Sequence, residues 1–314
     1  MKLSLSTNWC NRRLESGEEI ADKAMELGFA ELELGFHTTL EQVRGFKSRL
    51  DQIPVGSIHA FCPVPISAPQ GYPELYQLAN FDEEGRRMAL FQVKRNVTFA
   101  AEIGADTVVL HAGRVMCASL FESWYRRRRV TRGVKLLDVF RRTLDELRPV
   151  LEENKVTLAL ENLPYFEGFP NEYELKKILE WDLGGWVKGW YDTGHARVRE
   201  QNGWLDKSVD VRPEALDPQQ FAGMHLNDVV DKTDDHLAPS FGKVEFKALA
   251  AFAKGVRHVV FEPNAGVSES DLKKGIAHIR SLWNPCVPAK RAFPSREGRG
   301  DSASLSATAN LHEG

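Results

Sequence analysis

Short apolar segments alternate with longer amphipathic segments almost to the end of the chain, and this alternation predicts eight strand–helix units. The expected strands lie at 3–7, 30–34, 55–61, 107–111, 156–161, 187–191, 221–226 and 258–262. The expected helices lie at 16–28, 39–50, 83–103, 133–154, 171–181, 246–254 and 268–283, with an interrupted helical segment before residue 202. The order of elements is therefore typical of an α/β protein.

The expected strands are apolar on both faces, which is typical of a parallel sheet covered by helices. Eight such units in series predict a closed (β/α)8 TIM barrel, formed as a single domain by residues 1–285. An open doubly wound sheet is the alternative. It is less favoured because no glycine-rich phosphate-binding motif follows the first strand.

Two long connections and the C-terminal segment fall outside this alternation. Residues 62–82 form a proline-rich connection, and residues 114–129 are too long for an ordinary one, so we expect both to cover a functional site. Residues 286–314 are dominated by Pro, Arg, Gly, Ser and Ala and keep no apolar period. We therefore expect a disordered C-terminal tail.

Composition excludes several classes of protein. The 42% of apolar residues in 314 are enough to bury a large core, while a net charge of −3 gives no general attraction to nucleic acid or anionic membranes. No apolar run approaches the roughly 18 residues that span a bilayer. The first residues turn polar too soon for a signal peptide, and the four cysteines are widely spaced. We expect reduced thiols and a cytoplasmic protein.

Acidic and imidazole side chains recur where the expected strands end. Asp192 and His195 follow the sixth strand within Trp190-Tyr-Asp-Thr-Gly-His195, and comparable residues follow five other strands. The complete set is His59, His111, Glu161, Asp192, His195, His225 and Glu262, with Asp234 and His236 in the loop after the seventh strand. In a parallel barrel these strand ends meet at one mouth.

A cation is the simplest reason for such a set. Any single histidine at a strand end is more often part of the core than a metal ligand. Nine acidic or imidazole groups together, however, would suffer large desolvation and repulsion without a positive ion. We therefore predict a divalent metal centre, with Zn²⁺, Mn²⁺ or Mg²⁺ as the cofactor.

The same strand ends resemble those of the xylose-isomerase-like barrel superfamily, which holds sugar isomerases and epimerases together with endonuclease IV. The resemblance covers roughly residues 1–283, and the matching stretches are Ser57-Ile-His59-Ala, Val109-Leu-His111-Ala-Gly, Leu160-Glu161-Asn162, Asp192-Thr-Gly-His195, Met224-His225-Leu-Asn-Asp228, Asp234-Asp-His236 and Phe261-Glu262-Pro263. In the epimerase branch the resemblance implies one ion, held by Glu161, Asp192, His225 and Glu262. In the endonuclease IV branch it implies three zinc ions, held by all nine residues.

The favoured hypothesis is a metal-dependent isomerase or epimerase that acts on a small sugar, sugar phosphate or related polyol. Glu161 and Glu262 would then serve as acid and base on the two faces of an enediolate, and His195 would polarise a hydroxyl. The expected substrate contacts are His59, His111 and Glu167. One feature argues against this branch, because residues 227–243 lack the substrate-binding arginine that its members carry after strand seven.

The alternative is a zinc-dependent phosphodiesterase that acts on abasic DNA, and nucleic acid is a partner only under this hypothesis. The presence of His59, His111, Asp234 and His236 favours it, whereas the absence of an overall basic charge opposes it. The one basic run, residues 126–129, is either a phosphate site or the solvated start of a helix. A barrel that binds metal without turnover is disfavoured by the intact acid pair. The sequence leaves open a homo-oligomer and predicts no membrane partner.

Overall fold

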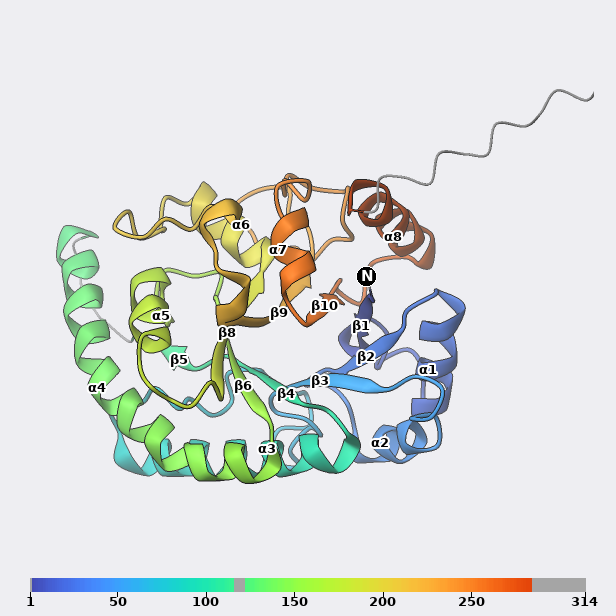
Figure 1. Cartoon of the computed structure of the whole chain (residues 1–314), viewed down its shortest axis with the longest axis horizontal. Helices are drawn as coiled ribbons and strands as arrows, with labels where there is room; N and C mark the ends of the chain where they lie inside the picture. Colours follow the sequence, from blue (N-terminus) through green and yellow to red (C-terminus); the bar gives the residue numbers. More distant parts are fainter. Residues whose placement is uncertain (1, 116–121, 284–314) are drawn as a thin grey trace, which may run out of the picture.

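The strands of the computed structural model, which describes residues 2–115 and 122–283, close into the expected barrel. Eight parallel strands follow one another in the order β1-β10-β9-β8-β6-β4-β3-β2 (Figure 1). Their bounds are β1 Ser4–Ser6, β2 Glu31–Leu34, β3 Val55–His59, β4 Thr107–Leu110, β6 Thr157–Glu161, β8 Val187–Asp192, β9 Phe221–Leu226 and β10 His258–Phe261. The predicted (β/α)8 fold class is confirmed.

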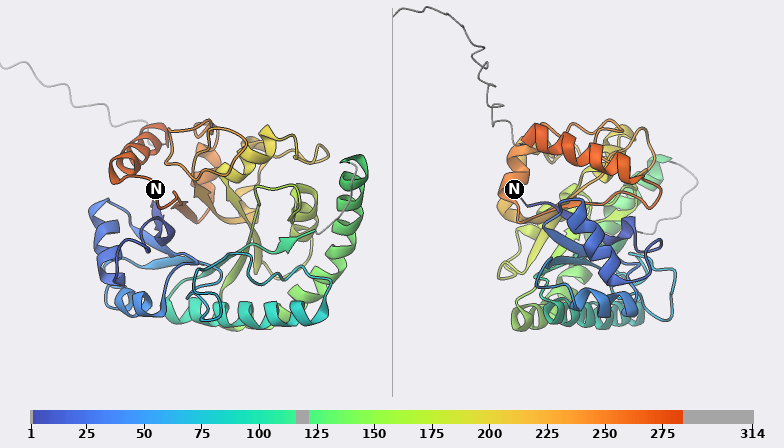
Figure 2. Two further views of the ribbon diagram at one scale, coloured as in Figure 1. Left: turned by 180° about the vertical axis from the view of Figure 1, so that it is seen from behind. Right: turned by 90° about the vertical axis from the view of Figure 1, so that its right-hand side faces the viewer.

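Helices surround the barrel on its outside (Figures 1 and 2). They are α1 Gly17–Glu26, α2 Leu40–Lys47, α3 Glu83–Ile103, α4 Glu122–Asn154, α5 Glu172–Leu179, α6 Thr193–Gln201, α7 Ala250–Gly255 and α8 Glu269–Trp283. Short 3-10 helices lie at Thr7–Trp9, Pro213–Ala215 and Pro218–Gln220. The Ser16 hydroxyl accepts from the Glu19 amide, and Glu19 caps the Ser16 amide in return, so a reciprocal capping box starts α1 as its sequence predicts.

A small second sheet lies outside the barrel. Strand β5 (Gly113–Arg114) follows β4, and strand β7 (Gly168–Phe169) follows β6, and the two pair antiparallel. Because both segments come directly after barrel strands, this sheet ties together two loops on the side of the barrel where those strands end. It therefore gives a fixed shape to part of the mouth.

The alternation of strand residues places a packed layer beneath the mouth. Side chains two positions apart on a strand point the same way, so each residue two places before an expected ligand also faces inward. Four of these residues, Val109, Ala159, Trp190 and Val260, are buried and form a separate apolar cluster with Ala222. The mouth thus has an apolar floor.

Helix α4 corrects one prediction from the sequence. Residues 114–129 were expected to be a connection and 133–154 a helix, but α4 already begins at Glu122. The polar run at its start consists of arginines, which favour helices, and one of them is held by a contact that no local pattern encodes. The Arg129 side chain is 1% exposed and pairs with Glu174 of α5 at 2.5 Å. Arg129 is therefore not available to a phosphate.

Three expectations about the rest of the chain have different outcomes. The predicted tail at 286–314 lies outside the described residues, and the domain boundary at 285 stays a prediction. Within 2–115 and 122–283, the helices lack either the length or the apolar character needed to cross a membrane.

Candidate metal centre

The nine residues expected at the strand ends come together at the mouth of the barrel. Their side-chain oxygen and nitrogen atoms form three overlapping groups, in each of which these atoms lie within 4.8 Å of one another. The groups are His59, His111 and Glu161; Glu161, Asp192, His225 and Glu262; and Asp192, His195 and His236. Asp234 joins the third group, because its carboxylate lies 3.4 Å from His195 Nε2 and 3.2 Å from His236 Nε2.

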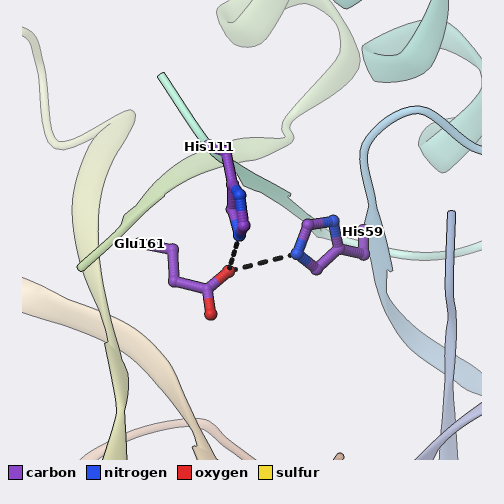
Figure 3. A group of neighbouring side chains, drawn as sticks. All are labelled: His59, His111 and Glu161. Atoms are coloured by element: carbon purple, nitrogen blue, oxygen red, sulfur yellow. Dashed lines mark hydrogen bonds and ion pairs between the residues drawn. The ribbon is translucent and has the colours of Figure 1, made fainter. Parts of the chain in front are cut away.

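The first group is centred on one oxygen of Glu161. Figure 3 shows the imidazoles of His59 and His111 converging on this atom, with each Nε2 at 3.1 Å from Oε2. The Glu161 side chain is fully buried, and the two histidines are nearly so. These three residues end β3, follow β4 and end β6, so they come from three adjacent strands of the barrel.

The second group surrounds His225 with three carboxylates. His225 Nδ1 lies 3.0 Å from Glu262 Oε2, 3.1 Å from Glu161 Oε1 and 3.6 Å from Asp192 Oδ2. All four side chains are buried. They come from strands β6, β8 and β9 and from the residue that follows β10. Glu161 uses its second oxygen here, so it belongs to the first and second groups at once.

The third group lies nearer the solvent. His195 Nε2 and His236 Nε2 face each other at 3.3 Å, and Asp234 approaches both. Asp234 and His236 are 33% and 21% exposed, whereas His195 is 3% exposed. Asp192 is shared with the second group. The third group is therefore the most accessible part of the centre.

Hydrogen bonds on the far side of the imidazoles fix which nitrogen is turned inward. Nδ1 of His59, His195 and His236 each lies within 3.0 Å of a backbone carbonyl, which only accepts. The hydrogen is therefore on Nδ1, and a neutral ring turns the lone pair of Nε2 inward. For His225 the roles are exchanged, since Nε2 lies 3.0 Å from Glu33 Oε1 and Nδ1 is turned inward.

This arrangement fits divalent cations. Inward lone pairs that face carboxylates, and in the third group face each other, repel unless protons or metal ions lie between them. A ligand histidine whose second nitrogen is anchored to a carbonyl or carboxylate is the usual pattern in metalloproteins. Mixed imidazole and carboxylate donors suit zinc and manganese. The residues present therefore match the metal centre that the sequence predicts.

The pKa values of the histidines also indicate that the site favours positive charge. Burial lowers the pKa of His195, but the nearby carboxylates of Asp192 and Asp234 outweigh this and raise the pKa to about 9. Burial likewise opposes charge on His225, yet Glu262 and its neighbours raise its pKa well above the usual value. The raised pKa values of these histidines mark a site that favours positive charge, so divalent cations would compete with protons there.

The centre is supported by residues that the sequence analysis did not select. The Asn8 amide donates to Glu262 Oε1 at 3.0 Å, and the Asn227 amide donates to Asp192 Oδ2 at 2.6 Å. Glu33 on β2 is fully buried and accepts from His225. The sequence offered a signal for Glu33, because a glutamate within a strand expected to be covered by helices needs a partner.

Two further acidic residues, Glu167 and Glu74, need separate comment. Glu167, an expected substrate contact, is half-buried and belongs to none of the three groups formed by the described residues, so its role stays a prediction. Glu74 was not selected, but it reaches the site from the 62–82 connection. Its Oε1 lies 3.5 Å from His111 Nδ1, and its Oε2 accepts from Arg114 Nε at 2.5 Å.

Comparison with known proteins identifies the family. The sequence profile of the xylose isomerase-like TIM barrel family matches residues 21–282. The chain belongs to this family. The resemblance found at the strand ends is thereby confirmed, and the three groups lie within the matched part of this xylose isomerase-like barrel.

Individual relatives are distant. The uncharacterized protein MJ1614 of Methanocaldococcus jannaschii is 24% identical over 205 residues, which cover 65% of this chain and 72% of that protein. Among solved structures, the Escherichia coli 3-keto-D-glucoside 4-epimerase YcjR has a TM-score of 0.67 at 20% identity, covering 90% of this chain and 99% of that one. The TTHB071 protein of Thermus thermophilus, soaked with ZnCl₂, has a TM-score of 0.60 at 22% identity, covering 91% and 99%. At these identities the structures establish the fold alone.

Proposed function

We propose that this protein is a metal-dependent hydrolase that cleaves a phosphodiester in a small organic substrate through a multinuclear centre. One observation carries this proposal. Glu161 is shared by the first and second groups, and Asp192 by the second and third, so the nine residues form one continuous site. Several cations held close together are typical of hydrolytic sites, where they stabilise both the attacking and the leaving oxygen.

Each residue has a distinct task under this proposal. Glu161 would help to hold cations of the first and second groups and Asp192 those of the second and third, and the remaining carboxylates and imidazoles would complete the three groups. Bound divalent ions would supply an activated water and stabilise the charge of the leaving oxygen. The partly exposed pair Asp234 and His236 would meet the substrate first, because the other ligands lie deeper.

A small substrate is favoured over a DNA duplex. The chain carries a net charge of −3, and the one basic run in the sequence turns its last arginine, Arg129, inward toward Glu174. A protein that grips a DNA backbone needs several accessible cationic side chains along one face. Arg114 lies beside the mouth with its guanidinium 3.8 Å from the centre of the Tyr165 ring, and its Nε donates to Glu74, so this 40% exposed side chain could serve at most a single phosphate group.

Metal content and hydrolysis test this proposal together. Protein stripped with a chelator and reloaded with zinc or manganese should hold more than one ion per chain by mass spectrometry of the metal. The loaded protein should hydrolyse bis(p-nitrophenyl) phosphate, and His236→Ala should lose this activity and part of the metal. His278→Ala, on the outer helix α8, is the matched control and should behave like the wild type. A single ion per chain, without hydrolysis, would contradict the proposal.

The sugar isomerase or epimerase favoured by the sequence remains the second candidate. Glu161 and Glu262 approach His225 at 3.1 and 3.0 Å and flank one cation position, as an acid–base pair acting on an enediolate would. The similarity in fold to YcjR, a 3-keto-D-glucoside 4-epimerase, points the same way. This function predicts exchange of a substrate α-proton with deuterium oxide across a panel of ketoses and ketose phosphates. Exchange that is lost in Glu262→Gln would favour the isomerase over the hydrolase.

A further inference from the structure

Four of the five histidines in the centre are anchored by the barrel or by the loops that leave its strands. His59, His195 and His236 contact backbone carbonyls, those of Ala60, Asn162 and Glu262. His225 contacts the buried carboxylate of Glu33 on strand β2 at 3.0 Å. All of these anchors end or directly follow barrel strands, so they move only with the barrel itself.

His111 is the exception. Its Nδ1 is buried and makes no hydrogen bond to the described residues, and the nearest carboxylate oxygen is Glu74 Oε1 at 3.5 Å. Glu74 is 17% exposed and belongs to the 62–82 connection rather than to a strand. Its other oxygen is held by Arg114 Nε on strand β5, and the Arg114 guanidinium stacks on Tyr165. The group that faces the outer side of His111 is therefore a carboxylate carried by a long connection.

We propose that Glu74 is a positioning residue that orients the His111 ring and thereby sets the cation affinity of the group His59, His111 and Glu161. This inference rests on the multinuclear centre of the proposed function. A carboxylate on the far side of a ligand imidazole fixes its tautomer and raises its basicity, and loss of such a partner typically costs about 10–100-fold in metal affinity.

Because Glu74 lies in the 62–82 connection, the first group (His59, His111 and Glu161) differs from the other two in what holds its histidines. A shift of the 62–82 connection, or loss of its link to Arg114, moves the anchor of His111 but leaves Glu33 and the backbone carbonyls in place. Affinity in the first group is therefore coupled to the 62–82 connection through Glu74, whereas the anchors of the second and third groups lie elsewhere. The first group should be the one that loses its cation when that connection is disturbed.

Metal titration of substituted proteins tests this inference without any substrate. Glu74→Gln keeps the shape of the side chain and removes its charge, and Glu74→Ala removes the anchor entirely. Arg114→Gln keeps the Glu74 side chain but removes the ion pair that holds its carboxylate. Glu153→Gln on the exposed face of α4 is the matched control. Each stripped protein is titrated with zinc against a chromophoric chelator, and the cobalt-loaded form is compared by visible absorption.

The expected result is that one class of ions binds about 10–100-fold more weakly in Glu74→Ala, with a smaller loss in Glu74→Gln and Arg114→Gln. The remaining ions should keep wild-type affinity, and the cobalt spectrum should lose the contribution of one site. A merely structural role would weaken all sites together or lower only thermal stability. Multiple ions in the wild type with unchanged affinities in both Glu74 variants would overturn this inference alone. A single ion per chain in the wild type would instead contradict the proposed function. If that one ion also bound with unaltered affinity in Glu74→Gln and Glu74→Ala, the inference about Glu74 would be overturned as well.

Discussion

The buried pair of Arg129 and Glu174 gives a sharp test of how α4 is held against α5. Arg129 Nη1 and Nη2 donate to the two carboxylate oxygens of Glu174 at 2.5 and 2.9 Å. Nη2 also donates to the Gly168 carbonyl and Nε to the Phe166 carbonyl. Both side chains are at most 2% exposed, so water cannot replace any of these partners.

Substituting Arg129 with Met should strongly destabilise the protein. The change leaves the Glu174 carboxylate buried, with the Asn171 amide as its remaining hydrogen-bond donor, and removes the Arg129 donors from the Phe166 and Gly168 carbonyls. Breaking a buried ion pair from one side costs about 3–5 kcal/mol. At roughly 2–4 °C per kcal/mol, this corresponds to a fall of about 6–20 °C in melting temperature.

Urea unfolding followed by circular dichroism measures the effect against two comparison proteins. Arg127→Met alters an exposed member of the same basic run and should change stability by less than about 0.5 kcal/mol. The double variant Arg129→Met/Glu174→Leu removes both charges and should regain much of the loss, because no buried charge is left unpaired. Some cost remains, since Glu174 also caps the start of α5. Equal effects of Arg129→Met and Arg127→Met would refute the argument.

Two further predictions concern the strands below and beside the centre. Burial opposes charge on His258, but its contacts with Asp106 and Glu31 outweigh this and raise its pKa above 6.5. The contribution of His258 to stability is therefore present below pH 6.5 and lost as pH rises through its raised pKa. In urea unfolding, His258→Gln should lose more stability relative to the wild type at pH 6 than at pH 9. An equal loss at both pH values would contradict this prediction. Glu33→Gln should weaken zinc binding by about 10–100-fold in chelator competition, because Glu33 anchors His225, whereas unchanged affinity would leave Glu33 a packing role alone.

The sequence alone determined the barrel and the set of groups at its mouth. Strand and helix periods are local, and a residue that ends an apolar strand lies at the mouth wherever that strand sits in the barrel. For this reason Glu161, Asp192, His225 and Glu262 were found without any knowledge of contacts, and the structure brings them together. The cost of crowding such groups without a cation also follows from residue type.

The tertiary structure decided which of these groups share partners and what holds them. Glu161 bridges two groups only because its two oxygens face histidines from different sides, and Glu74 meets His111 across a long separation in the chain. The start of α4 at Glu122 likewise accompanies the burial of Arg129 against α5. Contacts of this kind depend on how distant segments approach one another, and no local pattern of apolar and polar residues encodes that distance.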